Sequence, residues 1–314
     1  MNPAQLMKEG IRSLRKEGPA KTVLRLKSFL TYQAITRKRA LKYTALKTAS
    51  QNGQIERNVQ GSRMLLNLND EGISADLALD GIREPLSTRE VQEELKEGQM
   101  TIDIGANIGY YALMEARKVG KKGRVYAIEP VPENYRRLVK NIELNGYKNI
   151  EPYPLAIGDT TKRIKMYLSP HSNLHSMAPP KGKEIKGTVN VDMTTLDAFI
   201  KKRKIRPSFI RMDVEGYEYQ IIKGMRHILR KRDPLLLFIE LHPHIMGSEK
   251  TGWVLSTLQK HGFRTKKVIR SLTIPQIKAG ALRFDYTPMS MEEMLKDGSI
   301  LKGEKGAFEI FFER

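Results

Sequence analysis

Residues 100–109 constrain the fold of this chain more than any other segment. An apolar run ends at Asp103, a turn spaced by Gly105 and Gly109 follows, and a helical pattern of apolar residues begins at Tyr110. This order predicts a β-strand, a tight loop and an α-helix. Such a unit holds a ligand against the loop amides and the helix N-terminus.

The spacing of this loop indicates which ligand it binds. A dinucleotide loop reads G-x-G-x-x-G and accommodates a pyrophosphate, whereas this loop reads D-x-G-x-N-x-G. The carboxylate of Asp103 would repel a pyrophosphate and attract the ammonium and sulfonium groups of S-adenosylmethionine. The loop therefore favours S-adenosylmethionine as the cofactor. The residues predicted to hold it here are Asp103, Gly105, Asn107 and Gly109.

Two further apolar strands are predicted to end beside the same ligand. The first ends at Glu129, 26 residues after Asp103, near the roughly 20-residue offset at which an acid reaches ribose hydroxyls. The second, about 150–157, leads into a segment that should lie next to the adenine. Ala156 is a predicted cofactor contact in this segment. Asp159 either accepts a hydrogen bond from the adenine amino group or caps a turn.

Composition narrows the class of protein. The chain has 314 residues, 40% of them hydrophobic, and no cysteine. The absence of cysteine excludes disulfides, thiolate metal sites and a cysteine nucleophile. No stretch approaches the ~20 apolar residues of a membrane span, and the N-terminus lacks the apolar core of a signal peptide. We therefore expect a folded cytoplasmic protein.

The net charge of +20 is concentrated at the N-terminus, where residues 1–50 hold twelve Lys and Arg against two acids. Val23, Leu26 and Leu30 fall on one face of a predicted helix there. A basic amphipathic helix either lies on an anionic membrane surface or packs on its own protein, and the second outcome is the commoner one. Binding to RNA is a third interpretation, but the segment lacks the aromatic pattern of a stacking surface.

Three parts are predicted along the chain. A basic helical extension occupies 1–58, a lead-in strand with helices over 59–98 caps the cofactor site, and the cofactor-binding domain occupies 99–314 with an insertion at 160–192. Strands alternate with helices in this domain, including a helix over 219–229. This alternation predicts an α/β fold with a doubly wound, mainly parallel sheet and ligands at its carboxyl edge.

Candidate catalytic residues follow two later strands. Asp213 ends a strand that should lie beside the cofactor strand, and His242 follows a strand that ends at Glu240. Methyl transfer to a hydroxyl needs an aligned acceptor and a base within hydrogen-bond reach. The candidates are Asp213, His242 and Glu215, in that order. Alternatively, Asp213 and Glu215 only begin the next helix, where acids are favourable.

No residue is assigned to a metal. His171 and His175 have the i,i+4 spacing that pairs metal ligands on a helix, but Pro170 makes a helix doubtful. His242 and His244 have similarly weak metal spacing.

Together these motifs resemble the FkbM-type S-adenosylmethionine-dependent methyltransferases. The resemblance covers about residues 64–265 and rests on the segments 81–85, 103–109, 129–130, 155–159, 213–218 and 240–242. It implies a class I methyltransferase fold with a seven-stranded sheet, and it adds Glu84 to the cofactor-binding residues. It also implies O-methylation of sugars, glycans, polyketides or other hydroxylated small molecules, without fixing the acceptor.

Four functions fit parts of this pattern. The leading one is O-methylation of a small molecule or glycan. An RNA methyltransferase would use the basic surface. A non-catalytic nucleoside-binding module is disfavoured because Asp103, Glu129 and Asp213 are all present, and a dehydrogenase is disfavoured by the acid at the start of the loop.

Overall fold

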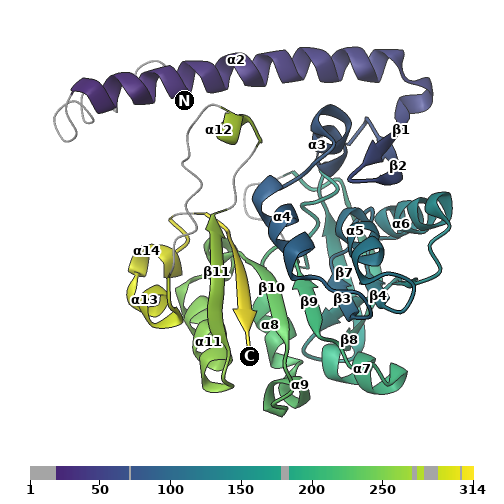
Figure 1. Cartoon of the computed structure of the whole chain (residues 1–314), viewed down its shortest axis with the longest axis vertical. Helices are drawn as coiled ribbons and strands as arrows, with labels where there is room; N and C mark the ends of the chain where they lie inside the picture. The colour runs from purple at the N-terminus through teal and green to yellow at the C-terminus, as the bar shows by residue number, and fades with distance from the viewer. Residues whose placement is uncertain (1–18, 71, 178–183, 271–273, 279–288, 305) are drawn as a thin grey trace. The chain divides into compact units, whose positions relative to one another are not determined.

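The computed structural model describes residues 19–70, 72–177, 184–270, 274–278, 289–304 and 306–314. The chain divides into two compact units, and each is described by itself (Figure 1). The first combines residues 1–49 with 272–285, and the second combines 50–271 with 286–314. Helices α2 (Pro19–Ala49) and α12 (Ile274–Lys278) belong to the first unit. In the described residues, no helix is both long enough and apolar enough to cross a bilayer.

The predicted helical extension over 1–58 is helical, in its described part, only as far as Ala49. Asn52 and Gly53 follow in a short 3-10 turn with φ angles of 56° and 66°, which interrupt the helix. The chain then forms β1 (Gln54–Val59), which pairs antiparallel with β2 (Ser62–Asn67).

A seven-stranded sheet forms the centre of the second unit. Its spatial order is β11 (Arg264–Arg270), β12 (Phe308–Glu313), β10 (Leu236–Leu241), β9 (Phe209–Met212), β3 (Met100–Ile104), β4 (Arg124–Ile128) and β5 (Ile150–Tyr153). Strand β12 runs antiparallel to both of its neighbours, and the remaining pairs are parallel. The predicted class I methyltransferase arrangement, doubly wound and mainly parallel, is confirmed.

Helices cover both faces of this sheet (Figure 1). One face carries α4 (Pro85–Glu94), α5 (Tyr110–Val119) and α6 (Pro132–Asn145). The other packs on α7 (Leu196–Arg203), α8 (Glu218–Lys223), α9 (Arg226–Arg230) and α11 (Ser248–Lys260). The shorter helices are α3 (Ile73–Asp80), which packs on β1 and β2, and α10 (Pro243–Met246), α13 (Met291–Lys296) and α14 (Gly298–Leu301), which contact α11.

A separate three-stranded sheet corrects one sequence prediction. It consists of β6 (Ala156–Gly158), β8 (Gly187–Thr195) and β7 (Lys162–Leu168). The single strand predicted over 150–157 is therefore wrong, because β5 ends in the main sheet and β6 belongs to the smaller one. Pro154 lies between them, and it has no N–H with which to continue a ladder.

The helix predicted over 219–229 is also divided in two. It breaks at Gly224, where a Cβ would overlap the backbone oxygen of Gly158. The chain needs a glycine at this close approach of α8 to β6.

The two faces of the sheet differ in chemistry because successive residues of a strand point to opposite sides. Toward α7, α8, α9 and α11 the strands present apolar side chains such as Ile104, Met212 and Ile239. The opposite face carries ionisable residues near the carboxyl ends of the parallel strands. They are Asp103 on β3, Arg211 on β9 and Glu240 on β10, and Glu309 lies opposite Glu240 near the start of the antiparallel strand β12.

Candidate active site

Gly105 shapes the loop between β3 and α5. Its φ of 85° lies in the left-handed region, and a Cβ there would overlap the backbone oxygen of Asp213. Glycine permits this approach, which brings the end of β9 against the loop. The Asp213 N–H donates to Ile104 O at 3.0 Å, so β3 and β9 lie side by side as predicted.

The first amides of this loop are already used within the protein. Gly105 and Ala106 donate to Ile128 O at 3.0 and 2.9 Å. Asn107 N–H donates to Glu129 Oε2 at 2.8 Å. The expectation that a ligand lies against these amides is therefore wrong for these three groups. Because a pyrophosphate depends on such donors, the same finding argues against a dinucleotide.

A pocket opens beside the loop at the carboxyl edge of the sheet. It holds about 800 Å³ of space between protein atoms, a volume that includes open solvent. Among the predicted site residues, those that line it are Gly105, Asn107, Glu129, Ala156, Asp213 and Glu215. The pocket thus connects the cofactor loop with two of the three candidate catalytic residues.

Glu129 lines this pocket and is 4% exposed. Its two oxygens accept backbone hydrogen bonds from Asn107 and Val131, each at 2.8 Å. Each carboxylate oxygen has a second lone pair, so Glu129 can also accept from two ribose hydroxyls. Burial raises its pKa to about 7, against the lowering effect of the two amides.

A loop of the predicted insertion borders the same pocket, and sequence reasoning missed it. Ser172 O accepts from the side-chain amides of Asn107 and Asn134, each at 3.0 Å. His175, which lines the pocket, accepts at Nδ1 from the Ser169 N–H at 3.0 Å. The insertion has no regular pattern of apolar residues, so its sequence does not predict that its polar residues lie at the pocket.

Four residues predicted to bind the cofactor do not line the pocket, namely Asp103, Gly109, Glu84 and Asp159. Asp159 pairs with Lys223 at 3.4 Å. Glu84 accepts from Tyr111 at 2.9 Å and from Arg83 at 2.6 Å, and Arg83 does line the pocket. Direct contact of these four residues with the cofactor stays a prediction.

Arg211 is the largest omission of the sequence reasoning. It is 5% exposed and lies between two acids. Nη1 is 3.0 Å from Asp103 Oδ1, and Nη2 is 2.8 Å from Asp213 Oδ2. The guanidinium also lies 3.9 Å from the ring centroid of Tyr111. One cation thus connects the acid of the cofactor loop to the leading catalytic candidate.

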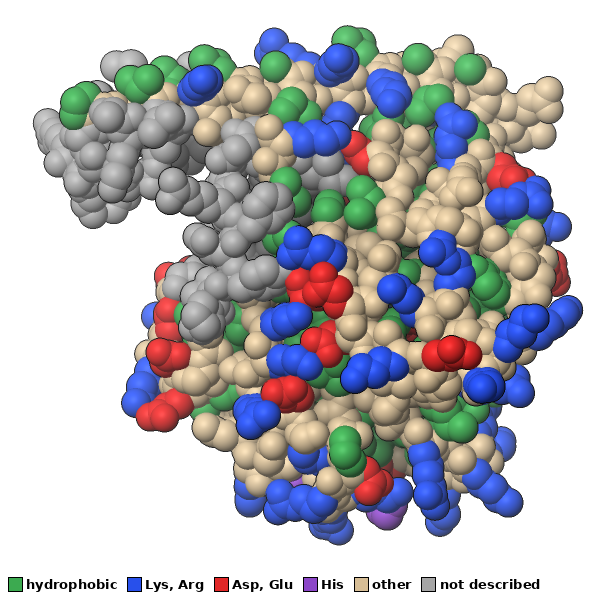
Figure 2. Space-filling view, viewed as in Figure 1, with side chains coloured by type: hydrophobic (Ala, Val, Ile, Leu, Met, Phe, Trp, Pro, Cys, Tyr) green, Lys and Arg blue, Asp and Glu red, His purple; other side chains and the backbone are tan. Residues whose placement is uncertain are grey.

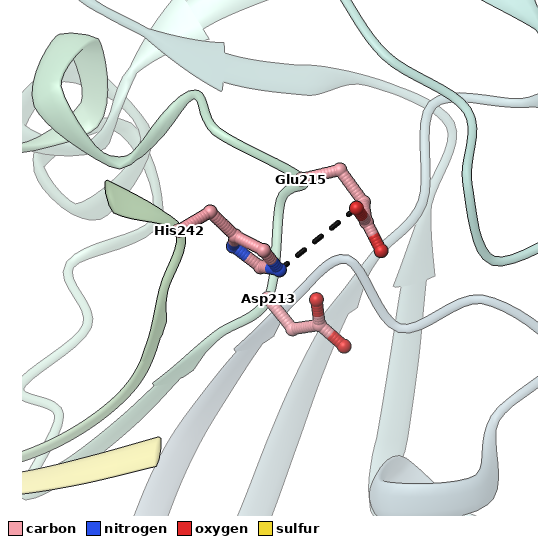
Figure 3. A group of neighbouring side chains, drawn as sticks. All are labelled: Asp213, Glu215 and His242. Atoms are coloured by element: carbon pink, nitrogen blue, oxygen red, sulfur yellow. Dashed lines mark ion pairs between the residues drawn. The ribbon is translucent and has the colours of Figure 1, made fainter. Parts of the chain in front are cut away.

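Asp213, Glu215 and His242 converge at the end of the pocket (Figure 3). One oxygen or nitrogen of each lies within 4.8 Å of the others. Asp213 and Glu215 follow β9 and line the pocket, whereas His242 follows β10 and is 3% exposed. Glu215 has a φ of 49°, a strained angle of the kind that clusters at functional sites.

Glu218 orients the imidazole of His242. The carboxylate is fully buried, and its Oε1 lies 2.7 Å from His242 Nδ1. Burial alone would lower the pKa of His242, but the surrounding carboxylates, Glu218 first, raise it well above its usual value. The carboxylates around the ring therefore stabilise positive charge at this position.

Asp213 has the opposite character. Burial would raise the pKa of its carboxyl, but Arg211, His242 and Arg83 together lower the pKa below the usual value. Asp213 is therefore ionised at neutral pH, and it is a weaker base than an unpaired carboxylate.

A second group of acids lies on the same face of the sheet. Glu240 and Glu309 are directly opposite each other on β10 and β12, and Glu84 completes a group of oxygens within 4.8 Å of one another. Ser87 donates to Glu309 Oε2 at 2.6 Å. Burial, followed by the neighbouring carboxylates, raises the pKa of Glu240 and of Glu309 well above the usual value.

Comparison with known families identifies this arrangement. Residues 103–265 match the family described as the methyltransferase FkbM domain, and this match covers more than half of the 314 residues. The chain belongs to the FkbM methyltransferase family. Its cofactor is S-adenosylmethionine, as predicted. The site suits this group, since Glu129 is a buried acceptor at the pocket and the loop amides are not available to a phosphate.

Two relatives show how far the similarity extends. The hexuronic acid methyltransferase AglP of Haloferax volcanii is 24% identical over 162 residues, which cover 51% of this chain and 62% of AglP. The protein-L-isoaspartate O-methyltransferase of Methanococcus maripaludis is 36% identical over 69 residues, which cover 22% of this chain and 31% of that protein. The chain spans less than two thirds of either relative.

Solved structures resemble this FkbM methyltransferase only distantly. An S-adenosylmethionine-dependent methyltransferase from Aquifex aeolicus is 16% identical, with a TM-score of 0.36 and coverage of 76% of this chain and 92% of that one. Aeropyrum pernix fibrillarin with bound S-adenosylmethionine is 14% identical, with a TM-score of 0.39 and coverage of 85% and 86%. Sequence identities and TM-scores this low do not indicate which acceptor this chain methylates.

Proposed function

We propose that this FkbM methyltransferase transfers a methyl group to a hydroxyl oxygen of a sugar or glycan. The single observation that carries the proposal is the continuity of the pocket. It runs from Glu129, a suitable partner for the ribose, to Asp213 and Glu215. A hydroxylated acceptor placed against these two carboxylates would lie next to the cofactor.

The proposed reaction needs positioning more than covalent help. S-adenosylmethionine supplies a methyl group on a positively charged sulfur. The acceptor oxygen attacks the methyl carbon in line, the carbon–sulfur electron pair returns to sulfur, and the hydroxyl proton passes to a nearby base. Asp213 remains the first candidate for that base, although its pairing with Arg211 at 2.8 Å weakens it.

The choice of a sugar acceptor rests on chemistry and on one relative. Carboxylates accept hydrogen bonds from hydroxyl groups, and two of them line the acceptor end of the pocket. The name of AglP gives a hexuronic acid as what that relative methylates. An RNA acceptor would call for a continuous basic surface. On the face in view in Figure 2, Lys and Arg side chains are mixed with Asp and Glu.

The test is methyl transfer by the full chain to a panel of acceptors. We expect a mass increase of one methyl group on a hexose, a hexuronic acid or a lipid-linked glycan, and none on RNA. Asp192→Asn, which changes an exposed carboxylate (side chain 82% exposed), serves as the control and should keep full activity. Methylation of RNA alone, or failure to bind S-adenosylhomocysteine, would overturn the proposal.

A further inference from the structure

His242 presents a buried ring nitrogen to two carboxylates without hydrogen-bonding to either. Nε2 lies 3.8 Å from Glu215 Oε2 and 3.7 Å from Glu240 Oε1, beyond the length of a hydrogen bond. Among the described residues, the one hydrogen bond of this ring is the 2.7 Å contact of Nδ1 with Glu218. A carboxylate behind one ring nitrogen, with the other nitrogen facing a polar cluster, is typical of a metal-ligating histidine.

The spacing of the three side chains in Figure 3 suits a shared ion. With metal–ligand bonds of about 2.1 Å, two ligands of one octahedral ion lie about 3.0 Å apart when adjacent and about 4.2 Å apart when opposite. The Glu215–His242 distance of 3.8 Å falls in this range. The ligand atoms of Asp213, Glu215 and His242 all lie within 4.8 Å of one another. Rotamer adjustments of less than an ångström would bring every pair into range.

The nearby arginines are already shared with other acids. Arg211 lies between Asp103 and Asp213. Arg83 pairs with Glu84 at 2.6 Å. Three glutamates, Glu215, Glu218 and Glu240, surround the imidazole. Closely grouped buried carboxylates bind a cation or take up protons.

We propose that Asp213, Glu215 and His242 bind one divalent cation of the Mg²⁺ and Mn²⁺ class at the acceptor end of the pocket. Two carboxylates and one imidazole form a mixed oxygen and nitrogen ligand set that suits Mn²⁺. Asp213 offers the cation its Oδ1, because its Oδ2 holds Arg211. The two carboxylates line the pocket and His242 lies behind them, so the remaining coordination positions face the acceptor.

The role of the cation rests on the proposed function, whereas its binding does not. A hydroxyl that coordinates a divalent cation has a lowered pKa. Such a hydroxyl releases its proton to water at the pocket opening, and the resulting alkoxide oxygen is the nucleophile. In this arrangement Asp213 is a ligand of the cation, and water replaces it as the acceptor of the hydroxyl proton.

The second acid group provides an internal comparison. Glu84, Glu240 and Glu309 are equally close to one another, but they include no imidazole, and none of them lines the pocket. Ser87 already donates to Glu309. We therefore place the cation with His242 and use Glu309 as a matched control.

The experiment is a titration of the EDTA-treated full chain with Mn²⁺, followed by the loss of the free-ion paramagnetic resonance signal. We expect one bound ion with a dissociation constant below about 1 mM. Glu215→Gln and His242→Gln should each weaken binding at least ~10-fold. Glu309→Gln and Asp192→Asn should leave it within ~3-fold of wild type. S-adenosylhomocysteine affinity reports whether each variant is folded, and Glu215→Gln carries the test if the histidine variant is not.

Three outcomes would overturn this inference. The first is a wild-type chain that binds no Mn²⁺ in this range. The second is a loss of Mn²⁺ binding in Glu309→Gln but not in Glu215→Gln. The third is methyl transfer at the full rate after chelation, which would remove the role of the cation. A chain that binds Mn²⁺ at this site but methylates no hydroxylated acceptor would instead overturn the proposed function and leave the cation site standing.

Discussion

Asp103 and Arg211 lie directly opposite each other on the neighbouring parallel strands β3 and β9, and their side chains form a buried ion pair of 3.0 Å. The same guanidinium holds Asp213 at 2.8 Å. Asp103 therefore influences the pocket through Arg211, which lines it, and not as a lining residue itself. This relationship joins the acid of the cofactor loop to Asp213, at the proposed acceptor end of the site.

Replacing Arg211 with Met should destabilise the protein strongly. The substitution leaves two carboxylates without their cation, and breaking a buried pair on one side costs about 3–5 kcal/mol. Urea unfolding measures the free-energy difference. Arg124→Met is the matched control, because Arg124 lies 3.6 Å from Glu151 with side chains 49% and 40% exposed, and it should cost less than ~1 kcal/mol. Equal costs for the two variants would contradict the structural role of Arg211.

Glu129→Ala should weaken S-adenosylmethionine binding by about 1.5–3 kcal/mol, the scale of hydrogen bonds to a charged group. Calorimetry at pH 8 measures it, because the carboxyl is ionised above its pKa of about 7. NAD should not bind either protein, since the loop amides donate within the chain. Wild-type affinity in the variant would mean that the ribose is held elsewhere.

The raised pKa of Glu129 predicts a pH dependence of cofactor binding. Below about pH 7 the free protein holds a proton on this carboxyl, and hydroxyl donors of the ribose favour the ionised form. Binding must then release the proton, so affinity should rise about tenfold per pH unit up to pH 7 and level off above it. S-adenosylhomocysteine is a zwitterion throughout this range and is the suitable ligand. Glu129→Gln should flatten the profile, and an unchanged profile in that variant would assign the titration to another group.

The sequence predicted the acids at the strand ends because each follows its own apolar run. Strand periodicity is local, so the positions of Asp103, Glu129 and Asp213 could be read without knowing the fold. That β3 and β9 are neighbours could be expected, because this strand order is usual in doubly wound sheets. The break after β5 was readable in principle, since Pro154 cannot continue a ladder.

The partners of these acids could not be read in the same way. Arg211 lies inside an apolar strand, and the two acids it contacts become neighbours only once β9 pairs with β3. Ser87 and Glu309 are 222 residues apart, and no local pattern joins them. Glu218 belongs to the segment that carried the family resemblance, but its contact with His242 depends on β10 lying beside β9.

Asp213→Asn should lower turnover by about 10²–10⁴-fold, the range for a lost proton acceptor, with S-adenosylmethionine affinity little changed. Steady-state kinetics on the methylated acceptor, with calorimetry for the cofactor, measures both. Turnover within a factor of ~3 of wild type would remove Asp213 as the base. A matching loss of cofactor affinity would reassign it to cofactor binding.

Helix α2 carries an apolar stripe whose members Val23, Leu26, Leu30 and Leu41 are 64%, 51%, 58% and 74% exposed. The segment 1–50 that contains them has a net charge of +10, and a basic amphipathic helix of this kind binds anionic lipid. We expect the double variant Leu26→Glu/Leu30→Glu to lower binding to vesicles with anionic headgroups at least ~10-fold, and wild-type binding to weaken at high salt.

The control is the double variant Ser28→Glu/Thr36→Glu, which adds the same negative charge at positions outside the apolar stripe. It should bind the vesicles better than the stripe variant does. Sedimentation with vesicles measures binding, and S-adenosylhomocysteine affinity should stay constant in all three proteins. Loss of that affinity in the stripe variant would show instead that α2 packs on its own protein.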